Sequence, residues 1–111
     1  MDKLTAYRNI IEEMLTEIAG YHGIPEEIET ELILDRERGH YLLVNVGWHD
    51  RKRTYGPTIH LDLKGDKVWL QQDRTDCRVA ERLIEKGIPK EDIVLAFHSP
   101  FTRQHTGFAA A

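Results

Sequence analysis

The chain has 111 residues, the size of one ordinary domain, and we expect a single domain spanning residues 1–111. Its composition, 41% hydrophobic and 31% charged, is typical of a folded globular protein and unlike that of a disordered or membrane-spanning chain. The single cysteine, Cys77, excludes an internal disulfide and any zinc site built from several cysteines. No charged segment leads into an apolar stretch at the amino end, so we expect a cytoplasmic location.

Charge is unevenly distributed along the chain. Residues 1–35 carry nine acidic and two basic side chains, residues 36–67 carry four acidic and seven basic ones, and the remainder is balanced. The formal net charge of −4 lacks the basic footprint of a stand-alone nucleic-acid-binding protein. An acidic first third and a basic middle third suit self-association, because one subunit can face the other with opposite charge, so we expect a homo-oligomer.

The first predicted element is an amphipathic helix. Apolar residues recur at spacings of three and four from Leu4 to Ile18, and Gly20 ends the pattern. Four strand-like runs separated by short turns follow, an order typical of an antiparallel meander. The runs are Ile28 to Asp35, His40 to Trp48, Thr54 to Leu63 and Lys67 to Gln72. Gly56-Pro57 interrupts the third run, and we expect a bulge or an edge there because proline cannot donate to a ladder.

A second helix is predicted from about Asp76 to Lys86, capped by Thr75 or by Asp76 itself. The run from Ile93 to Phe97 predicts a short strand buried on both faces, and the tail from His98 shows no clear period. The expected fold class is therefore α+β: an antiparallel meander sheet, an N-terminal helix, a second helix after the fourth strand, a short buried strand and an irregular tail. The predicted core residues are Leu42, Val44, Val46, Ile59, Leu61, Val68, Leu70, Leu83, Ile84, Val94 and Phe97.

Paired polar residues on the third predicted strand raise the question of a metal site. His60 and Asp62 are two residues apart, so both point to one face of the strand. With His40 or His49 from a neighbouring strand, they would supply the donor atoms for zinc or manganese. Polar pairs on the outer face of a half-buried strand are commoner than metal sites, so we predict neither a metal site nor a cofactor.

Asp62 also begins an acidic-x-Lys pattern that ends at Lys64, with Asp50 upstream as a second acid. Restriction-like nucleases use such residues to hold magnesium and to position a water. The competing interpretation is ordinary turn chemistry in Lys64-Gly65-Asp66. Because no nucleophile–base pair and no glycine-rich phosphate loop accompanies the pattern, we predict no catalytic residue and no enzyme, with a metal-dependent nuclease as an alternative.

The only basic triplet, Arg51-Lys52-Arg53, falls in a predicted hairpin turn. It is the candidate nucleic-acid contact, since contacts to the phosphate backbone need positive charge, and a direct DNA-binding module is a further alternative. The competing interpretation is a solvated hairpin end that protects the sheet edge. Trp48, Tyr55 and Trp69 could stack on bases, although aromatic side chains in strands more often belong to a core or an interface.

Five phrases of the sequence carry a family resemblance: LTAYRNIIEEML, YLLVNVGW, RTYGPTIHLDLKGDKVWLQQD, GIPKEDIVLAFHSP and RQHTGFAAA. They cover nearly the whole chain, and on them the sequence resembles the XisI family, the controlling factors for excision of the fdxN element in cyanobacteria. The resemblance implies an intracellular accessory protein for a DNA rearrangement in which a separate site-specific recombinase performs the strand chemistry. It also implies an XisH-type protein as a partner, and it supplies no catalytic residue.

The C-terminal segment, residues 98–108, is the candidate surface for that partner. It combines aromatic and arginine side chains, which are enriched at protein interfaces, and we assign partner binding to Phe101, Arg103, His105 and Phe108. The alternative is a structural role. In that case Phe101 or Phe108 would close the edge of the core, and Arg103 would pair with an acid of the first helix.

Overall fold

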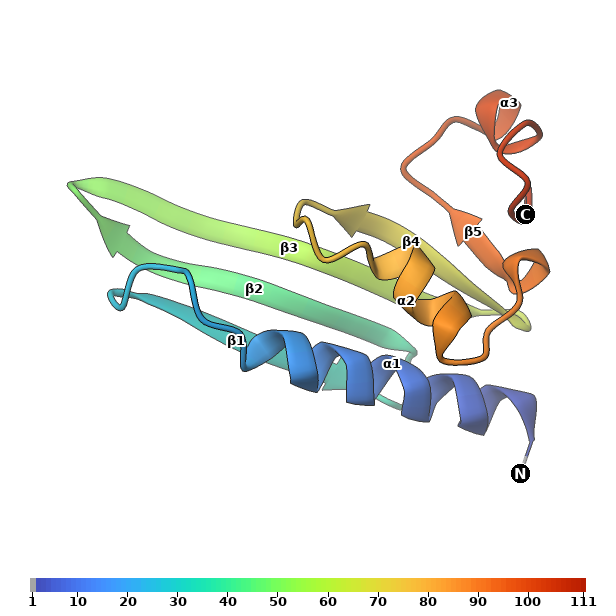
Figure 1. Cartoon of the computed structure of the whole chain (residues 1–111), viewed down its shortest axis with the longest axis horizontal. Coiled ribbons are helices and arrows are strands. Elements are labelled where there is room, and N and C mark those ends of the chain that lie inside the picture. The colour runs from blue at the N-terminus through green and yellow to red at the C-terminus, as the bar shows by residue number, and fades with distance from the viewer. Residues whose placement is uncertain (1) are drawn as a thin grey trace.

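A computed structural model describes residues 2–111, and Figure 1 shows the order of their elements. The elements are α1 (Lys3–Ala19), β1 (Ile28–Asp35), β2 (His40–His49), β3 (Lys52–Lys64), β4 (Lys67–Asp73), α2 (Val79–Glu85), a 3₁₀ turn η1 (Lys90–Asp92), β5 (Ile93–Leu95) and α3 (Pro100–Arg103). The strands form one sheet in the order β1-β2-β3-β4-β5. The first four strands pair antiparallel, and β5 runs parallel to β4. The predicted α+β meander is confirmed.

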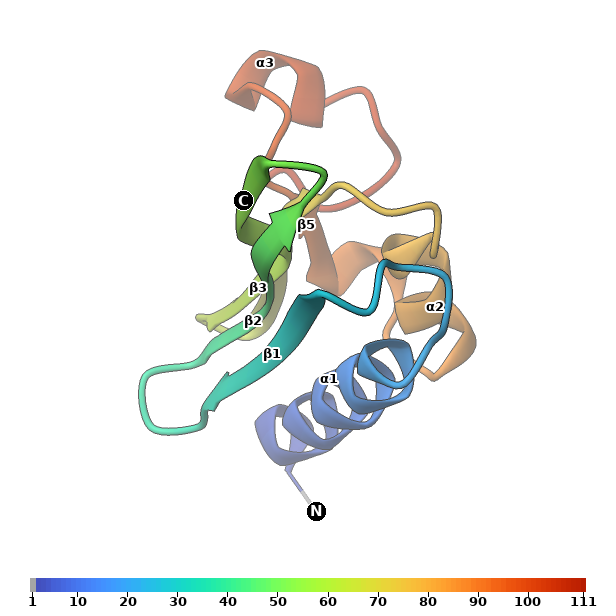
Figure 2. The same ribbon diagram turned by 90° about the vertical axis from the view of Figure 1, so that its left-hand side faces the viewer.

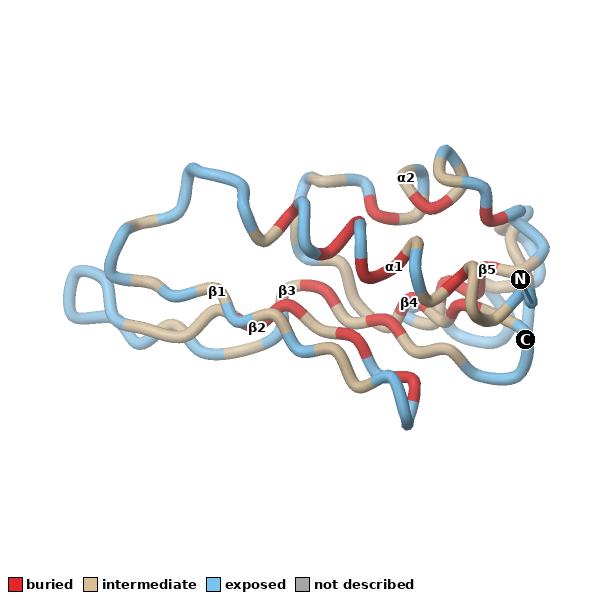
Figure 3. Tube along the Cα trace, turned by 90° about the horizontal axis from the view of Figure 1, so that it is seen from below, coloured by how far each residue is buried: buried red, intermediate tan, exposed pale blue. Residues whose placement is uncertain are grey.

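Helices α1 and α2 lie side by side against one face of the sheet, which we call the inner face (Figure 2). Ile11, Met14 and Leu15 of α1 are fully buried, because their helical spacing places them on the side that meets the sheet. Figure 3 shows the buried residues gathered between these helices and the sheet, while the tip of the β2–β3 hairpin is exposed. Within residues 2–111, no helix is long and apolar enough to cross a membrane.

The prediction of which face of β2 enters the core is wrong. The apolar alternation predicts Leu42, Val44 and Val46 against the core, but Tyr41 and Leu43 join the cluster under the helices, with 0% and 2% of their surface exposed. Successive side chains of a strand point to opposite faces, so Leu42, Val44 and Val46 lie on the other face of the sheet. We call this the outer face; Val44 is buried there, whereas the other two are partly exposed.

The other core predictions are largely confirmed. The buried ones are Ile59, Leu61, Val68, Leu70, Leu83 and Val94, and Ile84 is partly buried. The prediction for Phe97 is wrong, since 53% of its surface is exposed. The reason is that β5 ends at Leu95, where a turn follows in which the N–H of His98 donates to the Leu95 carbonyl at 3.1 Å. The tail is not irregular throughout, because Ser99 caps the short helix α3.

Helix α2 begins at Val79, later than predicted, and neither Thr75 nor Asp76 caps it. Asp73, at the end of β4, takes that role. One of its carboxylate oxygens accepts from the N–H of Thr75 at 3.0 Å, and the other accepts from the N–H of Val79 at 3.1 Å. A single side chain therefore holds the whole connection from the sheet to α2.

The expected irregularity in β3 is a β-bulge. Leu43 pairs with Ile59, but the next residue of β2, Val44, pairs with Pro57. Thr58 is therefore an extra residue in β3, and it directly follows the proline, which cannot donate to the ladder. The bulge shifts every later pairing of β2 with β3 by one residue.

Candidate functional site

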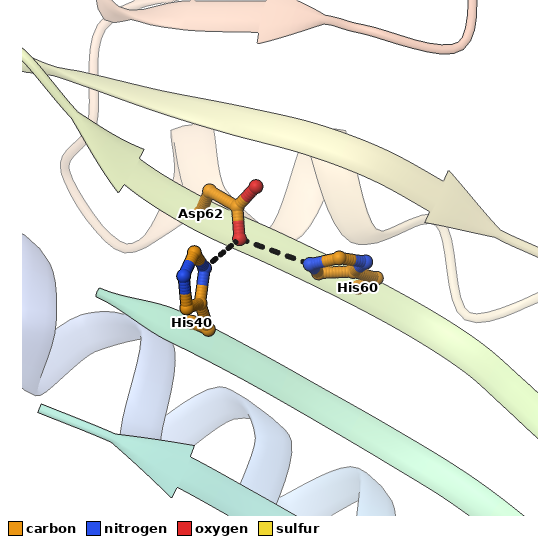
Figure 4. Close-up of side chains that lie close together, drawn as sticks. All are labelled: His40, His60 and Asp62. Carbon is orange, nitrogen blue, oxygen red and sulfur yellow. Dashed lines mark hydrogen bonds and ion pairs between the residues drawn. The ribbon is translucent and has the colours of Figure 1, made fainter. Parts of the chain in front are cut away.

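Three polar side chains converge on the outer face of the sheet (Figure 4): His40 of β2, and His60 and Asp62 of β3. His40 and Asp62 are directly opposite each other in the pairing of the two strands. Without the extra residue Thr58, a count back from the hairpin tip would place His40 opposite Leu61, whose side chain belongs to the core. The bulge is therefore what brings the histidine to the carboxylate.

Asp62 is the centre of this His40–His60–Asp62 cluster. Its Oδ1 lies 2.7 Å from Nδ1 of His40 and 2.9 Å from Nε2 of His60, and its Oδ2 accepts from the side-chain amide of Gln71 at 3.1 Å. Burial raises the pKa of the Asp62 carboxyl, but the hydrogen bonds from His40 and His60 outweigh burial and hold that pKa below its usual value. An ionised carboxylate only accepts hydrogen bonds, so both facing imidazole nitrogens carry protons in this arrangement.

The cluster is half-open to solvent. The side chain of Asp62 is 16% exposed, that of His60 is 30% exposed and that of His40 is 50% exposed. One nitrogen or oxygen from each residue lies within 4.8 Å of the others, and two imidazoles with a carboxylate are donors that suit a transition-metal ion. His49, the other third ligand that the sequence allowed, lies instead at the hairpin tip.

Sequence reasoning left His40 and His49 as alternatives and missed the role of Gln71. Signals for the choice were present, because Gly56-Pro57 predicted a bulge and the hairpin turn predicted where the count across the strands begins. No local pattern identified Gln71. It reaches Asp62 from β4, next to a second shift in register between β3 and β4.

The residues of the nuclease alternative do not come together. Asp50 precedes β3 and Asp62 lies near its far end, so a rise of about 3.3 Å per residue separates them by roughly 30 Å or more. The ammonium of Lys64 lies 4.1 Å from the ring centroid of Trp69, in a cation–π contact. These three residues therefore form no shared magnesium site.

The basic triplet Arg51-Lys52-Arg53 lies at the tip of the β2–β3 hairpin, and all three residues are exposed. Asp50 and Arg51 have φ angles of +51° and +67°, and two positive φ angles in succession are what a two-residue type I′ hairpin turn requires. The triplet projects from the sheet on this turn. Its place at a hairpin tip agrees with the sequence prediction.

The three aromatic residues proposed for base stacking do not form one platform. The Arg53 guanidinium lies 5.6 Å from the ring of Trp48 and 5.7 Å from the ring of Tyr55, so these two share the hairpin tip. Trp69 lies on β4 opposite Asp62, near the other end of the sheet. The hairpin tip carries an Arg–aromatic group, and Trp69 is separate from it.

In the C-terminal segment, Arg103 and Phe108 hold the chain in place. Arg103 donates from Nε to the carbonyl of His98 at 2.9 Å and from Nη2 to the carbonyl of Ala96 at 3.1 Å. Its hydrogen-bond partners are thus backbone carbonyls, and its guanidinium also lies 5.5 Å from the ring of Trp69. Among the described residues, it does not form the pairing with an acid of α1 that the structural alternative expected. Phe108 packs against the core cluster. Two of the four candidate partner-binding residues therefore make contacts within the chain.

The other two candidate partner-binding residues are presented to solvent. Phe101 is 72% exposed, and the ring of His105 contacts it edge-on with the centroids 5.2 Å apart. Phe97, which the sequence placed in the core, is exposed nearby along the chain, against the ring of His98. The exposed aromatic surface of this region therefore centres on Phe101.

Comparisons with known proteins agree on one family. The family model described as XisI protein matches residues 1–110. A solved XisI-like protein from Anabaena variabilis ATCC 29413 is 42% identical to this chain, with a TM-score of 0.92, and the match covers 97% of this chain and 99% of that one. The solved fdxN element excision controlling factor XisI from the same organism is 34% identical, with a TM-score of 0.86, and covers 99% of this chain and 100% of its own. No curated protein sequence matches the chain. Since both the family model and the two solved relatives span nearly the whole length, the chain belongs to the XisI family.

Proposed function

We propose that this protein is a non-enzymatic controlling factor for the site-specific excision of a DNA element and that it acts through contacts with other proteins. Membership of the XisI family supports the proposal, as does a full-length relative described as an fdxN element excision controlling factor. The partner is an XisH-type protein, and a site-specific recombinase supplies the strand chemistry, as the family resemblance implies. A cytoplasmic location and a cyanobacterial setting belong to the same proposal.

The observation that carries the proposal is the exposed side chain of Phe101 on a firmly held support. The surrounding backbone is held in place by the hydrogen bonds of Arg103, by the packing of Phe108 against the core and by the Ser99 cap of α3. A large aromatic side chain that is 72% exposed on such a support has no role in the core. Rigidly held aromatic residues are the typical anchors of protein interfaces, since little conformational entropy is lost when they bind.

A pull-down with an XisH-type protein tests this surface. Phe101→Ala should keep the thermal midpoint of the parent, because the side chain is exposed, and should weaken capture of the partner at least tenfold. Tyr55→Ala is the matched control, since Tyr55 is 74% exposed on the hairpin tip instead. Capture of the partner by Phe101→Ala at the parental level would show that the C-terminal segment is not the interface.

Self-association through the outer face is part of the proposed mode of action. Ile33 is 42% exposed and Trp48 is 58% exposed on this face of the first two strands. Strand β1 also carries the acidic residues Glu29 and Glu31, and the basic triplet lies at the hairpin tip. Two copies can therefore meet through their outer faces with opposite charges facing each other. Sedimentation equilibrium should show an oligomer that Trp48→Glu dissociates and Phe101→Glu leaves intact; a parent that is monomeric at every concentration would contradict self-association.

Direct DNA binding is the second candidate function, favoured by the exposed basic triplet beside Trp48 and Tyr55. Binding to phosphates releases counterions, so the affinity for duplex DNA should fall steeply with added salt. Replacing Arg51 and Lys52 with alanine should reduce the affinity and the salt dependence together. A gel-shift assay that detects no complex at low salt would eliminate this function.

A further inference from the structure

We propose that His40, His60 and Asp62 bind one divalent transition-metal ion, with Zn²⁺ as the representative ion. His40 Nδ1, His60 Nε2 and Asp62 Oδ1 would be its three protein ligands, and a fourth position would face solvent. Sites of this kind, with three protein ligands and one open position, are the usual form of zinc sites that take a water or a further ligand. The proposal does not depend on the function proposed above.

The distances within the cluster suit an ion. Zinc lies about 2.0–2.2 Å from nitrogen and oxygen ligands, so tetrahedral neighbours stand roughly 3.3–3.5 Å apart. The Asp62 oxygen is already 2.7 Å and 2.9 Å from the two imidazole nitrogens, so side-chain rotations of roughly half an ångström or a little more would open the site. The ion would replace the protons that these nitrogens now share with Asp62: a neutral imidazole would carry its proton on the other ring nitrogen instead, and an imidazolium would release one proton to solvent.

The surroundings hold the ligands in place. Gln71 donates to the second oxygen of Asp62, which orients the carboxylate and leaves Oδ1 directed at the histidines. The three ligands stand on paired strands in the interior of the sheet, and strands position side chains more rigidly than loops do. Among residues 2–111, the ion pairs of Asp62 are with these two histidines and not with a lysine or arginine, so no permanent cation occupies the carboxylate.

The donor set also selects the ion. Two imidazoles with one carboxylate suit zinc and its neighbours in the first transition row, whereas magnesium and calcium prefer oxygen ligands alone. The competing explanation is a hydrogen-bonded His–Asp–His group that binds no ion. It accounts equally for the observed distances, and the two explanations differ in what they predict for added metal.

Isothermal titration of the chelator-treated full chain with Zn²⁺ separates them. We expect one saturable site per chain. Affinity should fall at least tenfold in His60→Ala and in Asp62→Asn, the second of which keeps the shape of the side chain. His49→Ala is the matched control, because His49 also faces carboxylate oxygens, those of Glu27 at 3.5 Å and Asp50 at 3.2 Å. His49 lies on the exposed hairpin tip, away from the cluster, so this variant should bind Zn²⁺ as the parent does.

Thermal unfolding gives a second readout that needs no activity. An ion that binds only the folded chain raises the midpoint as its concentration exceeds the dissociation constant. Zn²⁺ should therefore raise the midpoint of the parent and of His49→Ala but not that of Asp62→Asn, and equal concentrations of Mg²⁺ or Ca²⁺ should have no effect. The proposal is overturned if the parent shows no saturable binding, or if His60→Ala and Asp62→Asn bind Zn²⁺ as tightly as the parent.

Discussion

Replacing Leu43 with alanine should lower the free energy of unfolding by about 2–3 kcal/mol. Truncating a buried leucine typically costs about 2–5 kcal/mol, because apolar contacts are lost and a cavity remains. Leu43 is 2% exposed within the core cluster, but it also borders an open cleft of about 400 Å³ beside Ile18 and Thr75, which lets the site relax. The lower half of the range therefore applies. For a domain of this size, the thermal midpoint should fall by roughly 10–15 °C.

Leu42→Ala is the control for this reasoning. The two leucines are neighbours in β2, but Leu42 lies on the outer face, where no helix covers it. Its truncation should cost about 1 kcal/mol or less in dilute solution, where any oligomer has dissociated. Urea unfolding followed by circular dichroism measures both variants, with an unchanged m value expected. If Leu42→Ala proves as costly as Leu43→Ala under these conditions, the assignment of the inner and outer faces is wrong.

Three further predictions concern local interactions. The Tyr7 hydroxyl donates to Asp92; this bond is the main cause that lowers the pKa of Asp92, while burial, followed by this bond, raises the pKa of Tyr7 to about 12. Stability should therefore be lost as the pH falls below 3.8 through the lowered pKa of Asp92, and again as the pH rises from 10.0 towards about 12. Tyr7→Phe should reduce the alkaline loss, and identical stability profiles for parent and variant would contradict this. Asp73→Ala should lower the free energy of unfolding by about 1–2 kcal/mol, since it removes the acceptor for two backbone N–H groups. A decrease below about 0.5 kcal/mol in urea unfolding would refute the capping role. Gly39→Ala should lower the free energy of unfolding clearly more than Gly65→Ala does. Both glycines have a positive φ, but only at Gly39 would a Cβ meet a carbonyl oxygen of β3, at 2.8 Å. Equal thermal midpoints for the two variants would contradict this close contact.

The elements themselves follow from local patterns in the sequence. The periodicity that runs from Leu4 to Ile18 matches α1, and the first four strands lie within two residues of their predicted bounds. Helical and strand periodicities depend on neighbouring residues alone, and the turns between them carry glycine or charged residues that permit sharp bends. The start of α2 was missed because its cap, Asp73, belongs to the preceding strand.

The face of a strand that enters the core is not a local property. In β2 the residues from Tyr41 to Val44 are all apolar, so both faces of the strand offer a hydrophobic surface. Two features determine which face enters the core. Helices α1 and α2 cover the face that carries Tyr41. On the same face, Gly47 lets the backbone of Ile28 approach closely, since the Ile28 Cα would lie 2.9 Å from a Cβ at Gly47. Alternation counts apolar residues, but it does not say which side a distant helix will cover.

The candidate functional site shows the same division. The sequence places His60 and Asp62 on one face of β3, because the side-chain period of a strand is two. The period alone does not decide whether His40 or His49 joins them, because that depends on how β2 and β3 are aligned, for which the hairpin turn and Gly56-Pro57 were the signals in the sequence. One extra residue, Thr58, determines the alignment, since a shift of one residue in register exchanges the faces of every later pair. Local chemistry therefore supplied the candidate ligands, and only the pairing of strands across the hairpin brought them together.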